Sequence, residues 1–156
     1  MMKITLICVG KLKESYWQEA EAEYLKRLST FAKVEIKEIR EEAFSPTTDR
    51  EKAKQNEAEK IRSAIPNGSK IIMLDETGKE FDSKSFAKRI DDYKNQGDAL
   101  CIIIGGPLGL DTELRASAHS VISLSRLTFT HQMARIFTLE QLYRAFMISN
   151  RRNYHY

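Results

Sequence analysis

Cysteine, tryptophan and proline are scarce in this chain of 156 residues, which contains two, one and three of them. Two cysteines cannot build a disulfide framework, and both Cys8 and Cys101 lie in apolar runs that predict buried strands. Long hydrophobic runs are absent too: the longest, such as 99–104, have six residues, whereas a membrane span needs roughly twenty. The N-terminal apolar run meets charges at once and has no small-residue cleavage site, which argues against a signal peptide. We therefore expect a cytoplasmic protein without membrane segments, folded as one domain over 1–156.

Positive and negative charges are unevenly distributed, although the net charge of +3 is small. From Leu114 to the end, the chain has six arginines, no lysine and one acid, Glu140. The arginines are Arg115, Arg126, Arg135, Arg144, Arg151 and Arg152. Arginine without lysine suits planar, bidentate contacts to phosphate or carboxylate. Two interpretations remain open: contacts to an anionic partner, or ion pairs with acids elsewhere in the fold or across a dimer.

Strand and helix patterns alternate along the chain without a linker or an internal repeat. Apolar or alternating runs predict strands at 3–9, 33–39, 70–75, 100–104 and 121–124. Helical patterns cover 15–31, about 50–65, a segment capped by Ser83, a short segment capped by Asp111, and 131–149. Strands separated by helices of this length predict an α/β fold, with a parallel-rich sheet and helices on both faces. The strand at 33–39 reads as lying near a sheet edge.

Ligands of such sheets gather at the carboxyl ends of the strands. Three strand ends are therefore expected to share one site: 74–77, 105–109 and 124–129. The second of them is a glycine turn, IGGPLG, in which the main chain can closely approach a ligand.

The sequence disfavours several classes of enzyme. The glycine turn lacks the Gly-Lys-Ser/Thr of a P-loop, and no acid follows about twenty residues on, as the dinucleotide fingerprint requires. The histidines at 119, 131 and 155 lack metal-ligand spacing. Ser123 and Ser125 have no adjacent histidine–acid pair that would make a nucleophile. His131 begins the last helix, where we expect it to bond the turn or cap the helix.

The last helix is apolar on nearly every face, yet it carries Arg135, Glu140, Gln141 and Arg144. Charges on so apolar a helix need partners, which indicates a subunit interface or an active site. For Glu140 and Arg144, an intrahelical ion pair between positions i and i+4 is an equal alternative.

Four phrases of the sequence together resemble one family. They are KITLICVGKLKESYW, IGGPLGL, LSRLTFTHQMARIFTLEQLYRAF and the terminal YHY. They are similar to the small SPOUT methyltransferases of the RlmH family, from the first residues to the last. The resemblance implies transfer of methyl from S-adenosylmethionine to N3 of a pseudouridine in a hairpin loop of 23S rRNA, on the assembled ribosome. It also implies a homodimer with a two-subunit site, and a C-terminal trefoil knot, which is rare among protein folds.

Site residues follow from the matching motifs. The cofactor contacts implied by the resemblance are Leu74, Gly105, Leu124, Ser125, Arg126, Leu127, Thr128 and Phe129. For the chemistry, the candidates are Arg144 to stabilise an imide anion, Glu140 to orient it, and His155 as base or stacking partner. The RNA-binding candidates are Arg135, Arg151, Arg152 and Tyr154. The tail departs from the family pattern, with Asn153 in place of proline and Tyr156 in place of a terminal cation.

Two other functions compete with this interpretation. A non-enzymatic ribosome-binding protein would use the arginine-rich tail and bind no S-adenosylmethionine. A flavodoxin-type domain would use the glycine turn for phosphate and bind a nucleotide instead.

Overall fold

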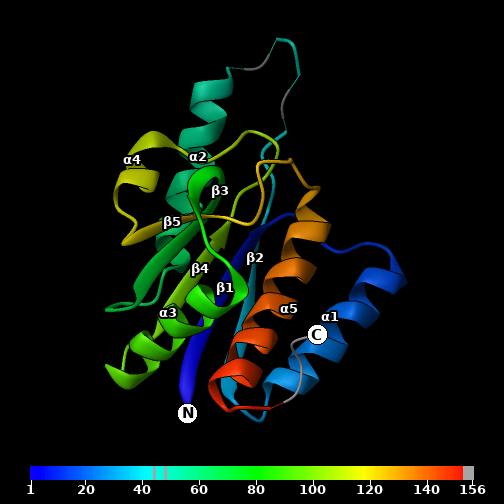
Figure 1. Cartoon of the computed structure of the whole chain (residues 1–156). Coiled ribbons are helices and arrows are strands. Elements are labelled where there is room, and N and C mark those ends of the chain that lie inside the picture. Colours follow the sequence, from blue (N-terminus) through cyan, green and yellow to red (C-terminus); the bar gives the residue numbers. More distant parts are fainter. Residues whose placement is uncertain (44, 48, 153–156) are drawn as a thin grey trace.

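A computed structural model of the chain describes residues 1–43, 45–47 and 49–152. Its centre is a five-stranded sheet in the order β2-β1-β4-β3-β5, in which all neighbouring strands are parallel (Figure 1). The strands are β1 (Met2–Val9), β2 (Ala32–Ile39), β3 (Lys70–Glu80), β4 (Leu100–Ile104) and β5 (Ser120–Ser123). This confirms the predicted α/β class and its parallel sheet, with β2 at one edge.

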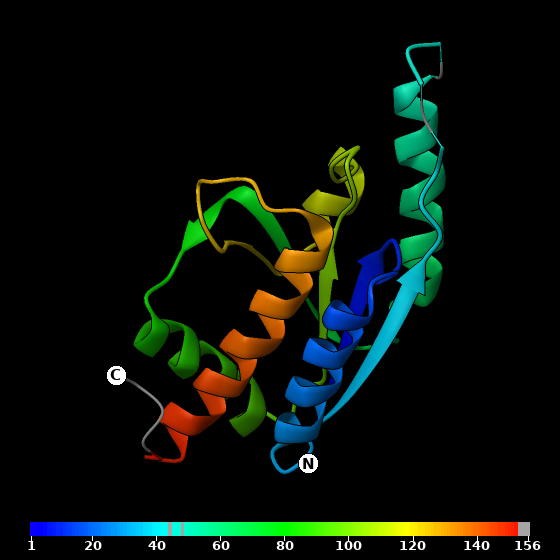
Figure 2. The same cartoon turned by 90° about the vertical axis from the view of Figure 1, so that its right-hand side faces the viewer.

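Helices cover both faces of the sheet, as predicted (Figures 1 and 2). They are α1 (Ser15–Leu28), α2 (Arg50–Ala64), α3 (Ser83–Asn95), α4 (Thr112–Ala116) and α5 (His131–Ser149). On one face, α5 packs against both α1 and α3. Helices α2 and α4 contribute to the apolar cluster on the other face.

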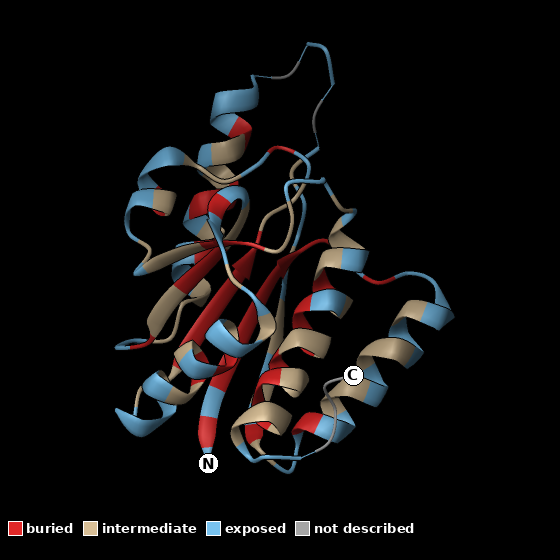
Figure 3. Cartoon of the chain, in the orientation of Figure 1, coloured by how far each residue is buried: buried red, intermediate tan, exposed pale blue. Residues whose placement is uncertain are grey.

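The middle strands are the most buried part of the molecule (Figure 3). All five residues of β4 are buried, and β1 is buried except at Lys3. Strands covered on both faces read as continuous apolar runs, which is why these two were easily predicted. Cys8 and Cys101 are buried free thiols in these strands.

Short polar side chains cap the N-termini of four helices. Asp49, Asp82, Asp111 and Thr130 accept hydrogen bonds from the main-chain N–H groups of Lys52, Ser85, Leu114 and Met133, respectively. Such bonds satisfy N–H groups that lack a partner in the first turn. Asp111 was predicted as a cap, whereas the prediction of Ser83 was wrong: Asp82 caps α3, and Ser83 is its first residue.

Strand β3 is longer than its apolar run predicted. A turn was expected at 76–78, but the strand continues to Glu80, because Lys79 and Glu80 pair with Ile122 and Ser123 of β5 after a shift in register. At Gly78 a Cβ atom would lie 2.7 Å from the carbonyl carbon of Ile122, so only glycine permits this approach. The extension depends on pairing with a distant segment, which no local pattern reveals.

None of the helices in the described part of the chain has the length and apolar character that crossing a membrane requires.

Candidate functional site

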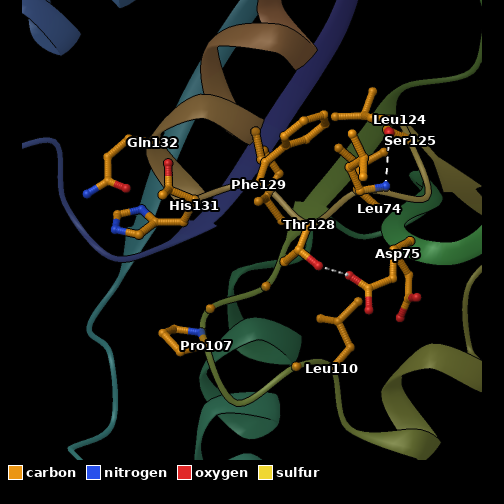
Figure 4. A pocket seen from close by; sticks show the side chains of 18 residues that line it. Leu74, Asp75, Pro107, Leu110, Leu124, Ser125, Thr128, Phe129, His131 and Gln132 are labelled. Atoms are coloured by element: carbon orange, nitrogen blue, oxygen red, sulfur yellow. Dashed lines mark hydrogen bonds between the residues drawn. The ribbon is translucent and has the colours of Figure 1, made fainter.

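A cleft of about 750 Å³ opens where the pairing of β3 with β4 ends, at Leu74 and Ile104, beside the segment that joins β5 to α5 (Figure 4). Its lining comes from 74–76, from most of 104–110, and from most of 124–134. These are the three segments that the strand pattern predicted to meet. Their convergence follows from the topology, because β4, β3 and β5 are successive neighbours in the sheet and run in the same direction.

The glycine turn after β4 forms one wall of the cleft. A Cβ atom at Gly105 would lie 3.1 Å from Cδ2 of Leu110, and one at Gly106 would lie 2.9 Å from Cγ1 of Val9. Gly109, with a φ of +79°, donates its N–H to the carbonyl oxygen of Gly106 at 3.1 Å. The turn is therefore folded tightly on itself, and its glycines present main chain to the cleft.

Hydrogen bonds order the segment between β5 and α5. Ser123 Oγ donates to the carbonyl oxygen of Ser125 at 2.9 Å, and Ser125 Oγ accepts from the N–H of Leu127 at 3.0 Å. Thr128 Oγ1 donates to the Glu76 carboxylate at 3.2 Å, which joins this segment to β3 (Figure 4). The cleft wall is thus held by short-range turns and by one bond between distant segments.

Seven of the eight residues expected to contact a cofactor line this cleft. They are Leu74, Gly105, Leu124, Ser125, Leu127, Thr128 and Phe129. Arg126 points elsewhere: its Nε lies 2.7 Å from the Glu80 carboxylate, and its Nη1 donates to the Glu76 carbonyl oxygen at 2.6 Å. Arg126 therefore fastens the segment to β3 from outside the cleft.

Two acids and one histidine are the ionisable groups in the lining, and it contains neither lysine nor arginine among the described residues. Burial by itself would raise the pKa of Asp75, but hydrogen bonds from Thr77 and the charge of Arg115 outweigh it and lower that pKa. Thr77 donates from both N and Oγ1, at 2.8 and 2.7 Å, and Arg115 Nε lies 3.7 Å from the carboxylate. Asp75 is consequently held as a carboxylate, and the cleft favours a cationic ligand over a phosphate.

His131 lines the cleft, which sequence reasoning did not predict. It is the first residue of α5, but Thr130 provides the cap. Burial, reinforced by the charge of Arg135, lowers the pKa of His131, so the imidazole is neutral at neutral pH. In the sequence, the one signal that His131 lines the cleft was its position shortly after 124–129, the third segment predicted to form the site.

Glu140 and Arg144 form an intrahelical ion pair, the alternative that the sequence left open. Arg144 Nε donates to Glu140 Oε1 at 3.0 Å, and Gln141 Nε2 donates to Glu140 Oε2 at 2.6 Å. Neither Glu140 nor Arg144 lines the cleft. Counted from Ala134 at the cleft, they lie roughly 9 and 15 Å further along the helix axis. The fold of one chain does not bring them to its own cleft.

Arg135 is buried inside the fold, with 1% of its surface exposed. Its Nη1 lies 3.0 Å from carboxylate oxygens of both Glu21 and Glu38, and its Nη2 donates to the Gly10 carbonyl oxygen at 3.0 Å. This position corrects the expectation that Arg135 contacts RNA, because its guanidinium is already engaged with acids of the fold.

Arg151 and Arg152 follow α5 and are exposed. The Arg152 guanidinium lies 5.5 Å from the centre of the Phe31 ring, and no acid of the described chain forms an ion pair with either arginine. The candidates Tyr154 and His155, and the departures at Asn153 and Tyr156, lie outside the described residues.

The cleft combines apolar walls, main-chain groups and negative charge. Leu74, Leu110 and Leu124 provide apolar walls, the glycine turn provides main-chain groups, and Asp75 and Glu76 provide negative charge. In the portion of the chain that the structure describes, no three histidine, cysteine or acidic residues gather as a metal site would require.

Comparison with known proteins agrees with this geometry. Residues 2–155 match the family model described as "Predicted SPOUT methyltransferase", which makes the protein a methyltransferase of the SPOUT class. The chain is 43% identical to the ribosomal RNA large subunit methyltransferase H of Streptococcus uberis, over 99% of both chains. It is 41% identical to the proteins of that name from Pseudothermotoga lettingae and Desulforamulus reducens, again over 99% of this chain and at least 99% of theirs. The chain therefore belongs to the RlmH family of large-subunit rRNA methyltransferases.

Proposed function

We propose that this protein transfers a methyl group from S-adenosylmethionine to N3 of a pseudouridine in a hairpin loop of 23S rRNA. We further propose that it acts in the cytoplasm on the assembled ribosome. The observation that carries the proposal is the cleft: three segments with family motifs form it, and it is apolar, acidic and free of lysine and arginine among its described residues.

The residues of the cleft suit each part of such a cofactor. Leu74 and Leu124 can cover the faces of the adenine, while main-chain groups of the glycine turn and of Leu127 and Thr128 can hydrogen-bond its edge. Asp75 and Glu76 complement a positive charge. When bound, the cofactor supplies a methyl group on a sulfonium, and the cleft's task is to hold the acceptor nitrogen in line with it.

The proposed enzyme is a homodimer that uses the outer face of α5. Leu127, Met133 and Phe137 are large apolar residues with 74%, 41% and 41% of their surface exposed. Met133, Phe137, Glu140 and Arg144 recur at spacings of four, three and four residues, which places them on one side of the helix. A second copy of this chain is the occupant we propose, because an isologous contact would cover the same apolar residues on both subunits.

This dimer gives Glu140 and Arg144 a route to catalysis. Both are partly exposed on the α5 face that the second copy would cover, so each could act at the partner's cleft. The ring of Phe129, which lines the cleft, lies 5.0 Å from that of Phe137 on the same face. The proposed interface and the cleft are therefore adjacent.

The remaining parts of the proposal concern the RNA and the chain topology. Arg151 and Arg152, together with Tyr154 and His155, are proposed to contact RNA near the site. A C-terminal trefoil knot is proposed from family membership.

Titration calorimetry and methylation mapping test this function. We expect the protein to bind S-adenosylmethionine but neither ATP nor FMN, and to methylate N3 of one pseudouridine in ribosomes in preference to free 23S rRNA. Mass spectrometry of RNA fragments identifies the modified base. Ribosome binding without cofactor binding or methylation would instead support the non-enzymatic alternative.

Gly105→Val is expected to abolish cofactor binding in a folded protein. The backbone at Gly105 is not in the left-handed region, so its conformation does not exclude a side chain. A Cβ atom there would lie 3.1 Å from Cδ2 of Leu110, so valine would displace Leu110, which lines the cleft. Gly105→Ala should weaken the affinity by less, because it adds one carbon. Calorimetry gives the affinities, and circular dichroism verifies folding. Unchanged affinity in folded Gly105→Val would remove the glycine turn from the site.

A further inference from the structure

The cleft contains the neutral imidazole of His131, which is not among the residues proposed to contact the cofactor. In Figure 4, His131 and Gln132 lie at the opposite end of the cleft from Leu74 and Asp75, with Pro107 near them. The apolar walls suited to an adenine gather at the Leu74 end. The His131 end is therefore available to the base that receives the methyl group.

The two acids of the cleft already have hydrogen-bond donors. Asp75 accepts from Thr77 N and Oγ1, and Glu76 accepts from Thr128 Oγ1 at 3.2 Å. By contrast, no hydrogen bond to either ring nitrogen of His131 is formed within the described residues, and its Nδ1 is buried without a partner. His131 is thus the ionisable group of the cleft lining that keeps its hydrogen-bonding capacity for a ligand.

Packing fixes the ring of His131 in place. A Cβ atom at Gly10 would lie 2.8 Å from the ring's Cε1, so the imidazole occupies the space that a side chain at Gly10 would need. Gly10 has a φ of +104°, and its carbonyl oxygen accepts from Arg135 Nη2. The ring therefore rests on a main-chain segment that Arg135 anchors.

Burial, and after it the charges around His131, set the pKa of its imidazole. Burial and Arg135 lower its pKa, whereas Glu14 from the β1–α1 loop, Glu38 from β2 and Glu41 beyond β2 act in the opposite direction and are outweighed. Nδ1 is the buried ring nitrogen, and Arg135 is the buried cation one turn further along α5. A proton on Nδ1 would be a buried donor without an acceptor, so we place the proton of the neutral ring on Nε2.

We propose that the Nε2–H of His131 donates a hydrogen bond to a carbonyl oxygen of the acceptor base and stabilises the anion formed when its N3 loses a proton. In this step the N3–H bond breaks, the proton goes to water, and the electron pair remains on the nitrogen, delocalised over the two flanking carbonyls. A donor fixed before the reaction stabilises such developing charge most effectively. This inference rests on the proposed function, since it requires a uracil-type acceptor.

His131→Phe and His131→Gln test this role. Phenylalanine keeps a planar ring over Gly10 but has no donor, whereas glutamine keeps an N–H donor. We expect His131→Phe to lower kcat by about a hundredfold to a thousandfold, as loss of one such donor does in other enzymes, and His131→Gln to recover part of that loss. Affinity for S-adenosylmethionine, measured by calorimetry, should stay within about twofold of wild type in both variants.

The pH dependence of the rate separates this role from a structural one. Below the pKa of the bound N3–H, the rate falls with the anion fraction, and the His131 donor lowers that pKa. In His131→Phe the inflection should therefore move to higher pH, by about two units for a hundredfold loss of anion stabilisation. In the free wild-type protein, NMR of the ring nitrogens should show a proton on Nε2 at neutral pH.

His119→Phe is the control for loss of an imidazole outside the cleft. Because His119 Nδ1 accepts a hydrogen bond from the N–H of Ile71 at 3.0 Å, the thermal stability of this variant is measured alongside. An unshifted pH profile or unchanged kcat in His131→Phe would overturn the inference. So would a proton on Nδ1, or a loss of cofactor affinity that accounts for the loss of rate. A wild-type protein that does not methylate ribosomes would instead contradict the proposed function itself.

Discussion

A single residue, Arg135, joins four parts of the fold through its guanidinium. It starts from α5 and reaches Glu21 of α1, Glu38 of β2 and the Gly10 carbonyl oxygen after β1. Burying a cation stabilises a fold only when its partners are well placed, whereas removing the cation leaves acids without a counter-charge. Arg135 is thus a structural residue that also supports the segment beneath His131.

Arg135→Met should destabilise the protein by about 3 kcal/mol, the low end of the range for breaking a buried pair. The low end applies because Glu21 and Glu38 keep 20% and 38% of their side-chain surface in contact with solvent. Lys88→Ala is the control: it removes an exposed pair with Asp92, and we expect a loss of about 0.5 kcal/mol or less. Urea denaturation measures the free energy of unfolding of both variants. Equal losses would show that the buried ion pairs of Arg135 contribute no more to stability than an exposed pair.

Glu57 offers a test of stability against pH. It lies in α2 with 3% of its surface exposed and accepts from the N–H of Glu42 at 3.0 Å. Burial, aided by the charges of Glu41 and Glu42, raises the pKa of Glu57 despite that bond and Lys60. The unfolded chain therefore releases this proton at a lower pH than the folded protein, so stability is lost as pH rises through the folded pKa.

Glu57→Gln should consequently be more stable than wild type at pH 8, because glutamine keeps the acceptor and does not ionise. The difference should shrink as the pH falls and vanish below the ordinary carboxyl pKa of about 4.5. Thermal denaturation from pH 4 to pH 8 follows it. A difference that is independent of pH would mean that the carboxyl group is not the cause.

Elements were predictable from the sequence where their pattern is local. Strand 100–104 and helix 131–149 were placed with the bounds that the structure has, because a fully apolar run and a helix after a polar cap are read without knowledge of their neighbours. The end of β3 was not, since Lys79 and Glu80 are in a strand only through β5. The Asp82 cap was missed by one residue, as helix ends commonly are.

Helix α5 has an inner face that packs on the sheet and an outer apolar face. A substitution on the outer face tests the proposed homodimer. Met133→Glu places a charge among exposed apolar residues without touching the cleft lining. We expect wild type to elute with twice the mass of one chain in light-scattering chromatography, and Met133→Glu to be a monomer that has lost methylation. Lys88→Glu on exposed α3 should leave the dimer intact. A dimeric Met133→Glu would move the interface elsewhere.

At the scale of the whole molecule, the sequence predicted where the site lies but did not predict the ion-pair partners of the arginines. The rule that ligands bind at strand ends brought three segments together correctly, because the sheet order makes them neighbours. It could not show that Arg115, Arg126 and Arg135 pair with acids of the fold, since those partners come from distant positions. The pair of Arg144 with Glu140 was one of the two alternatives that the sequence left open. Of the arginines in the last third, this leaves Arg151 and Arg152 for an external anion.

Those two arginines determine what we expect of RNA binding by the whole protein. Each phosphate contact releases counterions, so the logarithm of the affinity falls with the logarithm of salt concentration by close to one unit per contact. Arg151→Ala/Arg152→Ala should therefore weaken ribosome binding and reduce that slope by up to about two.

Arg152→Ala alone also loses its contact with Phe31, so thermal stability is measured alongside. Lys88→Ala/Lys94→Ala brings the net charge from +3 to +1 equally, but on α3. If both double variants lost affinity alike, the overall charge of the molecule, and not the end of α5, would govern the encounter with RNA.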